Sequence, residues 1–185
     1  MDNDSQLGFA LLGLVHEQPQ SGYDLRKVFA STAMGSFSDS PGAIYPALAR
    51  LEKRGFVRGD VEETTSLRKR RVFRITPKGL VAFKAWLKKP VTRYDVVRGL
   101  GELMLRFAFM EFTLGAGHAA VFLRQFADEL SGYVPSLEQF LEVHGKTMPL
   151  SARLAVECGV MEYEARLKWV KSSLAIYEQR KGNQS

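Results

Sequence analysis

The stretch that most constrains this chain is Ser40–Gly55, SPGAIYPALARLEKRG, which predicts one short helix with two different faces. Its first serine can cap the helix and its last glycine can end it. Pro46 removes a backbone donor early in the helix and predicts a locally distorted first turn. Helical spacing places three residues on one apolar face: Ile44, Leu48 and Leu51. The opposite face carries small residues at its start and basic residues near its end: Gly42, Pro46, Ala49, Arg50 and Lys53. Such a face suits a helix that enters a DNA groove, and it is also found on ordinary amphipathic surface helices.

Directly after this helix, the spacing of the apolar residues changes from that typical of a helix to that typical of a strand. Residues 56–59 and 72–75 predict two strands, with Phe73 and Ile75 on one face and Val72 and Arg74 on the other. The polar segment 60–71 between them predicts the turn of a hairpin. It ends in four consecutive cations: Arg68, Lys69, Arg70 and Arg71. Such a run can simply be exposed to solvent, but directly after a helix that suits a DNA groove it favours contacts with phosphates.

Three further helices are predicted in the same half. Residues 5–16 form the first, and the second begins at Ser21, which pairs with Asp24 in a capping-box pattern. The last begins at Thr76-Pro77 and ends before Pro90. Helix, helix, helix, basic hairpin, helix is the order of a winged helix-turn-helix DNA-binding domain, which we expect over residues 1–90.

The charge distribution agrees with a nucleic-acid partner. Of the 185 residues, the first 90 contain 15 Lys and Arg against 9 Asp and Glu, whereas residues 91–185 contain 11 of each. The whole net charge of +6 therefore lies in the first half. An excess confined to one half suggests an electrostatic footprint for a polyanion.

Other features limit the class of protein. No apolar run reaches the roughly 18 residues of a membrane span. The apolar stretch 7–15 follows Asp2 and Asp4 rather than cations, which argues against a signal peptide. The single cysteine, Cys158, excludes an intrachain disulfide and reads as a small core residue rather than a redox sensor. We therefore expect a cytoplasmic protein.

Residues 91–185 predict only helices, and we expect them to form a dimerisation domain. Gly132 and Pro135 are expected to bend or break the middle helix. The last helix carries two apolar stripes, and a second subunit is the economical way to cover both, with burial within one chain as the alternative. One stripe is a heptad-like seam, predicted as the dimer interface: Val156, Val160, Tyr163, Leu167, Val170, Leu174 and Tyr177. Which stripe faces the partner stays open, and the second comprises Leu154, Cys158, Met161, Ala165 and Trp169.

No catalytic residues, metal site or cofactor are predicted. His16, His118 and His144 do not stand at metal-ligand spacing with a second ligand. The glycine pairs at 99 and 101 and at 115 and 117 do not follow a strand, so they do not form a phosphate loop. A small enzyme or ligand carrier built on the helical half would need convergent polar groups, and the last helix offers mainly apolar ones.

Several positions of the first half follow one known pattern: Leu11-Leu12-Gly13-Leu14, Pro19, Gly22-Tyr23-Asp24-Leu25, Gly42, Ile44-Tyr45-Pro46, Leu48, Leu51-Glu52, Gly55-Phe56-Val57, Arg71-Val72-Phe73-Arg74-Ile75-Thr76 and Gly79. The Ile-Tyr-Pro triplet is the most specific of them, because proline is rare inside a helix. With these positions the chain resembles the PadR family of bacterial transcriptional regulators over roughly residues 7–88. A looser likeness to the family's dimerisation helix rests on Gly159, Tyr163, Leu167 and Trp169.

The resemblance implies a homodimeric regulator, usually a repressor, whose third helix and wing contact operator DNA. It also implies release by a small aromatic effector, for which Trp86 and Trp169 could line a pocket, although core or interface positions are their usual role. The expected operator is a pseudo-palindrome with half-sites about one helical turn or more apart. The alternative is a winged-helix adaptor that binds proteins. The predicted DNA-binding residues are Ser38, Ser40, Gly42, Ala43, Tyr45, Pro46, Ala49, Arg50, Lys53, Arg68, Lys69, Arg70 and Arg71.

Overall fold

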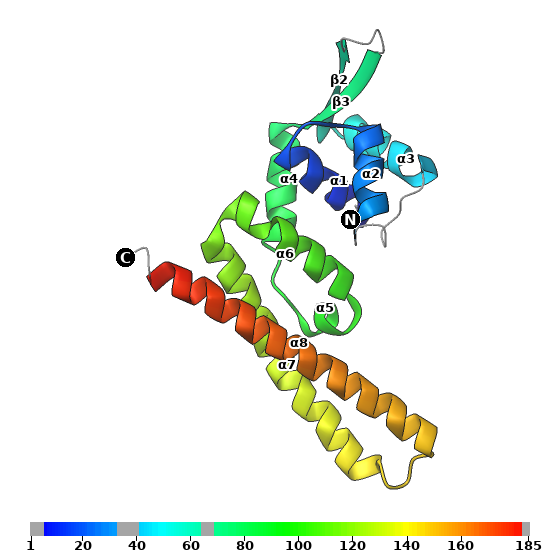
Figure 1. Cartoon of the computed structure of the whole chain (residues 1–185), viewed down its shortest axis with the longest axis vertical. Helices are drawn as coiled ribbons and strands as arrows, with labels where there is room; N and C mark the ends of the chain where they lie inside the picture. The colour runs from blue at the N-terminus through cyan, green and yellow to red at the C-terminus, as the bar shows by residue number, and fades with distance from the viewer. Residues whose placement is uncertain (1–5, 33–40, 64–68, 183–185) are drawn as a thin grey trace. The chain divides into compact units, whose positions relative to one another are not determined.

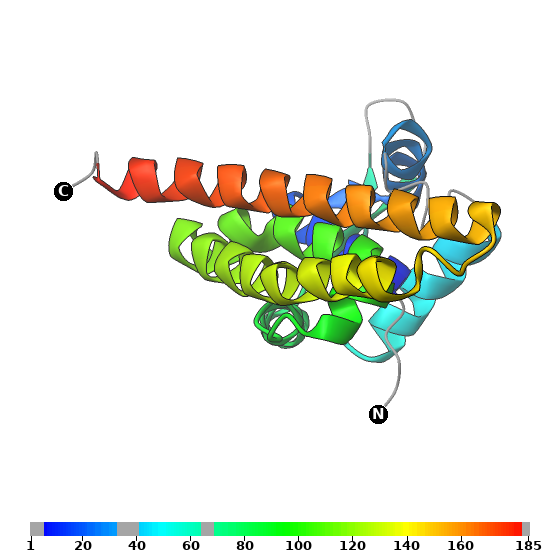
Figure 2. The same ribbon diagram turned by 90° about the horizontal axis from the view of Figure 1, so that it is seen from below.

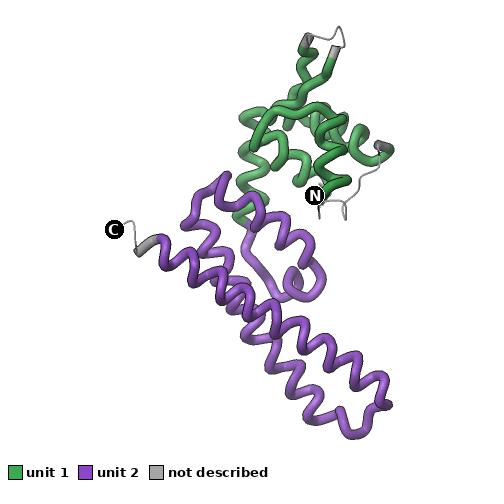
Figure 3. Tube along the Cα trace, viewed as in Figure 1, with its two compact units in different colours: residues 1–88 green, residues 89–185 purple. Residues whose placement is uncertain are grey.

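The computed structural model describes residues 6–32, 41–63 and 69–182. The chain divides into two compact units, residues 1–88 and residues 89–185 (Figure 3). The first unit combines helices with a small antiparallel sheet and the second is described as helices alone, so the predicted mainly α fold class is confirmed. Within the described ranges, no helix combines the length and the apolar character that crossing a membrane requires.

Four helices form most of the first unit: α1 (Gln6–Glu17), α2 (Gly22–Ser31), α3 (Pro41–Lys53) and α4 (Pro77–Leu87). Their starts follow local sequence signals. Ser21 and Asp24 form the predicted capping box at α2, and the Thr76 hydroxyl accepts a hydrogen bond from the Gly79 N–H at α4. α3 is α-helical throughout, so the distortion expected at Pro46 does not interrupt it.

The sheet has three strands in the order β1-β3-β2, all antiparallel: β1 (Gln20–Ser21), β2 (Val57–Glu63) and β3 (Lys69–Ile75). The hairpin is longer than the sequence predicts, because residues 60–63 and 69–71 pair as strands instead of forming the turn. Its outer end extends past the helices of the same unit (Figure 1). Charged residues can extend both strands because opposite charges face each other near the outer end, where Glu62 lies opposite Arg70 and Glu63 opposite Lys69.

The core of the first unit is apolar and aromatic. Phe83 is fully buried and Trp86 is only 2% exposed. The Trp86 ring stacks on the ring of Phe9, with 4.4 Å between centroids. Trp86 is therefore a core residue of this unit, so its side chain offers little surface to an effector.

The second unit contains α5 (Arg93–Arg98), α6 (Leu100–Leu114), α7 (Ala116–His144) and α8 (Leu150–Gly182). α7 and α8 lie side by side and run in opposite directions in both views (Figures 1 and 2). Of the bend or break expected at Gly132 and Pro135, the break is wrong, since α7 continues through both. A proline removes only one backbone donor, which a long, packed helix can tolerate.

Polar contacts hold the ends of these helices together. Arg106 of α6 is 2% exposed, donates a hydrogen bond to the Lys89 carbonyl, and lies 5.2 Å from the Phe122 ring centre. Burial lowers the pKa of Arg106, and the carboxylates of nearby acidic residues oppose that shift. At the far end of α8, the Tyr177 hydroxyl donates a 2.6 Å hydrogen bond to Glu111 of α6.

Candidate nucleic-acid interface

The predicted groove-facing residues of α3 lie where the helical spacing places them. Ile44, Leu48 and Leu51 are at most 2% exposed and anchor the helix in the core. Ala43 is half-buried at the edge of the apolar face. The remaining predicted residues of this helix are exposed: Gly42, Tyr45, Pro46, Ala49, Arg50 and Lys53. One face of α3 therefore presents small residues at its start and two cations near its end.

Some predicted contacts fall outside what the structure describes. Ser38, Ser40 and Arg68 lie outside the described residues. Lys69 is the first residue of β3, and its side chain is not described. For these four residues, as for the other predicted contacts, a role in DNA binding stays a prediction.

The arginines at the base of the basic run are engaged with carboxylates of two helices. Arg70 forms an ion pair with Asp24 of α2. Arg71 Nη2 lies 2.7 Å from both carboxylate oxygens of Glu52 on α3. At these two positions the positive charge is balanced within the unit, and the arginines connect the hairpin to α2 and α3.

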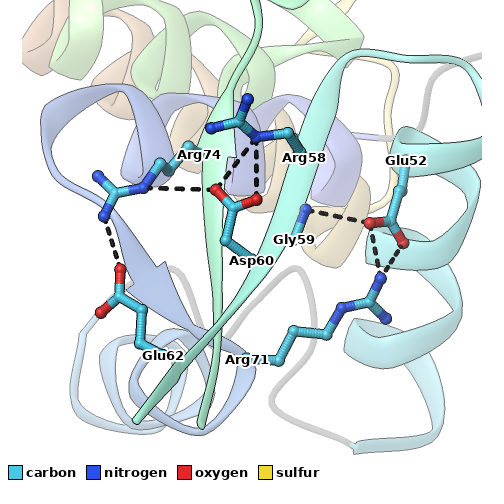
Figure 4. A network of polar contacts seen from close by, with 7 residues as sticks. All are labelled: Glu52, Arg58, Gly59, Asp60, Glu62, Arg71 and Arg74. Atoms are coloured by element: carbon cyan, nitrogen blue, oxygen red, sulfur yellow. Dashed lines mark hydrogen bonds and ion pairs between the residues drawn. The ribbon is translucent and has the colours of Figure 1, made fainter. Parts of the chain in front are cut away.

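The face of the hairpin opposite to that of Arg71 carries a separate ion-pair network, drawn in Figure 4. Arg74 lies 2.6 Å from Glu62 and 3.8 Å from Asp60. Arg58 lies 3.0 Å from Asp60. These pairs are largely exposed and each contributes little to the free energy of unfolding. They do reduce the net positive charge of the hairpin.

A groove of about 450 Å³ lies between α2, α3 and β3. Tyr23 and Tyr45, which line it, are both about half exposed. Its remaining lining combines apolar residues with charged ones: Ser21, Gly22, Leu48, Ala49, Glu52, Arg70, Arg71 and Phe73. The exposed face of α3 and one side of β3 thus meet at one concave surface.

Sequence reasoning missed the acidic partners on this surface. Asp24 was predicted only as a capping residue and Glu52 only as part of a motif. Their pairing with Arg70 and Arg71 joins residues far apart in the chain, which periodicity does not reveal. One signal in the sequence pointed to such a pairing: Glu52 is an acidic residue between the basic residues Arg50 and Lys53 of the same helix.

The surroundings of two histidines and of the lone cysteine are ordinary. Burial, with Lys84 second, lowers the pKa of His16, whose ring meets the edge of Phe83. His118 Nδ1 lies 3.0 Å from the Leu114 carbonyl oxygen. Cys158 is exposed, so the prediction that it is a small core residue is wrong. In the described part of the chain, no three His, Cys, Asp or Glu residues form a group that could hold a metal ion.

In the second unit, the heptad-like seam of α8 packs against its own chain. Val170 is fully buried and Val160 is 8% exposed. Tyr163 meets Tyr133 of α7 edge to face, with 4.9 Å between ring centroids. The five other seam residues are half-buried: Val156, Tyr163, Leu167, Leu174 and Tyr177. The seam thus has an intrachain partner, and its role as dimer interface stays a prediction.

The second stripe of α8 is the more exposed one. Leu154 is 50% and Met161 68% exposed, and Cys158 and Ala165 are exposed as well. Trp169 is 40% exposed and touches Phe107 edge to face, with 5.8 Å between ring centroids. Leu150 and Ile176 extend the same row at 63% and 57% exposure. We call these seven residues the exposed α8 row: Leu150, Leu154, Cys158, Met161, Ala165, Trp169 and Ile176.

Comparison with known proteins identifies the first unit. Residues 11–85 match the family model described as "Transcriptional regulator PadR-like family". No curated protein matches this chain.

Solved structures that are similar to this chain include PadR and PadR-like proteins. Bacillus subtilis PadR in complex with operator DNA is 22% identical, with a TM-score of 0.41 over 92% of this chain and 98% of that one. The PadR-like regulator BC1756 from Bacillus cereus is 23% identical, with a TM-score of 0.41 over 92% and 94%. Bacillus subtilis PadR in complex with p-coumaric acid is 20% identical, with a TM-score of 0.42 over 94% and 99%.

The family model covers most of the first unit. Its range begins within α1 and ends within α4, so it spans the complete helix-and-hairpin arrangement that carries the α3 surface. The members of the matched family are transcriptional regulators and not enzymes. Residues 11–85 of this chain therefore form a PadR-like transcriptional regulator domain.

Proposed function

We propose that this chain is a sequence-specific DNA-binding repressor that acts as a homodimer in the bacterial cytoplasm. The observation that carries the proposal is the exposed face of α3 in a PadR-like domain, small at its start and basic at Arg50 and Lys53. Small residues allow a helix to approach base edges closely, and cations near its end can contact phosphates.

The proposed DNA surface has two parts. The face of α3 enters the major groove, with Tyr45 at the groove edge and Ser38 and Ser40 near phosphates at the helix start. The hairpin follows the adjacent backbone, and Arg68 and Lys69 of its basic run contribute a mainly electrostatic contact. Arg70 and Arg71 support this contact by holding the hairpin through their ion pairs with Asp24 and Glu52.

A dimer supplies the second half-site of a pseudo-palindromic operator. The exposed α8 row supports this proposal, because a stripe of large apolar side chains on a long helix is costly to leave in water. The more buried heptad-like seam contributes to the proposed dimer interface only through its half-exposed edges. Release by a small aromatic effector is proposed from the family resemblance.

The decisive experiment measures binding of the purified protein to the promoter region of its own gene and to a scrambled duplex, in a salt series. We expect tighter binding to the promoter and a steep loss of affinity with salt. Arg50→Ala and Lys53→Ala should each flatten the slope of log K against log salt by about one unit if the cation contacts a phosphate. Lys146→Ala is the matched control, because it removes an exposed cation from the turn before α8.

Equal, weak binding to both duplexes would contradict sequence-specific regulation. It would favour the alternative of a winged-helix adaptor that binds another protein.

A further inference from the structure

Glu52 occupies an unusual place on the proposed DNA surface. It lies on α3 between the exposed cations Arg50 and Lys53, where a carboxylate would repel phosphates. Instead of pointing freely into water, its carboxylate accepts hydrogen bonds from β2 and β3 together. Glu52 Oε1 lies 3.0 Å from the Gly59 backbone nitrogen and 2.7 Å from Arg71 Nη2, and Oε2 lies 2.7 Å from the same Nη2 (Figure 4).

The sheet register explains how one carboxylate reaches both strands. Gly59 lies opposite Phe73, and Arg71 precedes Phe73 by two residues, so Arg71, Phe73 and Gly59 share one face of the hairpin. The Arg71 guanidinium carbon lies 5.4 Å from the Phe73 ring centre. β2 is an edge strand, and Glu52 accepts the hydrogen bond of an amide that points away from the ladder.

Gly59 provides the room for this arrangement. A Cβ at position 59 would lie 2.6 Å from Arg71 Nε and 3.0 Å from Glu52 Oε1. The arginine side chain would have to move before any other residue could occupy the position. The three groups therefore form one interdependent contact, which we call the Glu52 clamp: Glu52, Gly59 and Arg71.

The clamp contributes little to stability but fixes geometry. The Arg71 side chain is 53% exposed and that of Glu52 30%, so water screens much of their attraction. A two-stranded hairpin is only marginally stable by itself, and its angle to the neighbouring helix depends on such anchoring contacts. On the α2 side, the ion pair between Arg70 and Asp24 provides a second anchor.

We propose that Glu52 is a positioning residue for DNA binding: through Arg71 and Gly59 it sets the placement of the hairpin relative to α3. This inference rests on the proposed function, because it assumes that α3 and the hairpin contact the same duplex. Two contacts on one rigid ligand bind tightly only when their spacing is fixed in advance. Loss of the clamp costs affinity although Glu52 itself touches no DNA.

Glu52→Ala and Glu62→Ala form a matched pair for the test. Each removes one carboxylate from the surface of the α3–hairpin region, and Glu62 pairs only with Arg74 among the contacts described for it, on the other face of the hairpin. A purely electrostatic account predicts that both variants bind DNA as tightly as the parent chain or more tightly. The clamp predicts that Glu52→Ala weakens promoter binding by about two- to thirtyfold while Glu62→Ala does not.

Further variants separate positioning from direct contact. Arg71→Ala should weaken binding by a similar factor, leave the salt slope unchanged, and add nothing to Glu52→Ala in the double variant. Glu52→Gln keeps an acceptor for the Gly59 amide and should retain part of the affinity. An unchanged thermal unfolding midpoint shows that each variant is folded.

Two results would overturn the proposal. One is promoter binding by Glu52→Ala equal to or tighter than that of the parent chain. The other is a salt slope lowered by about one unit in Arg71→Ala alone, which would make Arg71 a direct phosphate contact. If the parent chain shows no preference for the promoter, the proposed function fails. The clamp can then still be tested without DNA, by measuring hydrogen exchange of the Gly59 amide. Faster exchange of the Gly59 amide in Glu52→Ala supports the clamp, and unchanged exchange refutes it.

Discussion

The first turn of α4 lies directly against the backbone of Phe56: a Cβ at Gly79 would overlap the Phe56 carbonyl oxygen. The same oxygen accepts a 3.0 Å hydrogen bond from the Thr76 N–H, and the Thr76 hydroxyl donates a 2.6 Å hydrogen bond to the Gly55 carbonyl. This contact joins the end of α3, the start of β2 and the start of α4. Only glycine fits at position 79 without moving backbone atoms.

Gly79→Ala should therefore destabilise the first unit by about 2–3 kcal/mol, since backbone on both sides must shift. Urea unfolding followed by circular dichroism measures the change. Gly117→Ala is the control, because a Cβ there meets nothing within 4 Å and alanine favours a helix over glycine. A Gly79→Ala protein as stable as Gly117→Ala would contradict the close approach.

Gly22 gives a prediction about function rather than stability. A Cβ at Gly22 would lie 2.5 Å from Tyr45 Cε1, and the ring is 49% exposed, so it can move aside. Gly22→Ala should change the free energy of unfolding by no more than about 1 kcal/mol relative to the parent chain. It should weaken promoter binding, because Tyr45 leaves the groove edge. Fluorescence anisotropy with labelled promoter DNA measures the affinity. If Gly22 acts through Tyr45, adding Gly22→Ala to Tyr45→Ala should not lower the promoter affinity further. Losses of affinity that add up in the double variant would show that Gly22 acts in another way.

Tyr177 makes the stability of the second unit sensitive to alkaline pH. Burial, with the hydrogen bond to Glu111 second, raises the pKa of Tyr177 from 10.0 to about 12. The folded chain therefore keeps the phenolic proton that the unfolded chain loses near pH 10. The resulting stabilisation is complete below pH 10 and is lost as the pH rises towards 12.

Tyr177→Phe removes this contribution, so its stability deficit relative to the parent chain should shrink between pH 10 and pH 12. Unfolding by urea across this pH range tests the sign. Tyr94→Phe is the control, since that ring is 73% exposed. A Tyr177→Phe deficit that stays constant to pH 12 would show that the phenol is not held in its protonated form.

Local signals in the sequence predicted the helix starts and the faces of α3. The capping box at Ser21 and the threonine cap at Thr76 each depend on residues three positions apart. The burial of Ile44, Leu48 and Leu51 follows from helical spacing alone. These features could be predicted because adjacent residues determine them.

Features that depend on distant residues could not be predicted in this way. The two-residue strand β1 exists only through pairing with β3, with Gln20 opposite Phe73. The pairing of Arg71 with Glu52 spans 19 residues. Both α8 stripes looked equally apolar in the sequence, and only the packing of α7 distinguishes the buried one from the exposed one.

The exposed α8 row has a charge pattern that suits a second copy of this chain. Residues 150–164 contain one basic and three acidic residues, whereas residues 165–182 contain five basic and one acidic. In an antiparallel pair of α8 helices, the acidic half of each would face the basic half of the other. A parallel pair would place like charges together.

Replacing Leu154 and Met161 with glutamate should therefore convert the proposed dimer into a folded monomer, because both side chains are at least half exposed and contribute little to the fold of one chain. Sedimentation velocity measures the mass. Promoter affinity should fall by about a hundredfold or more, since each half-site then binds alone. Val143→Glu on α7 is the control, with a residue 64% exposed outside the row. A Leu154→Glu, Met161→Glu double variant that remains dimeric would move the interface away from this row and back to the edges of the seam.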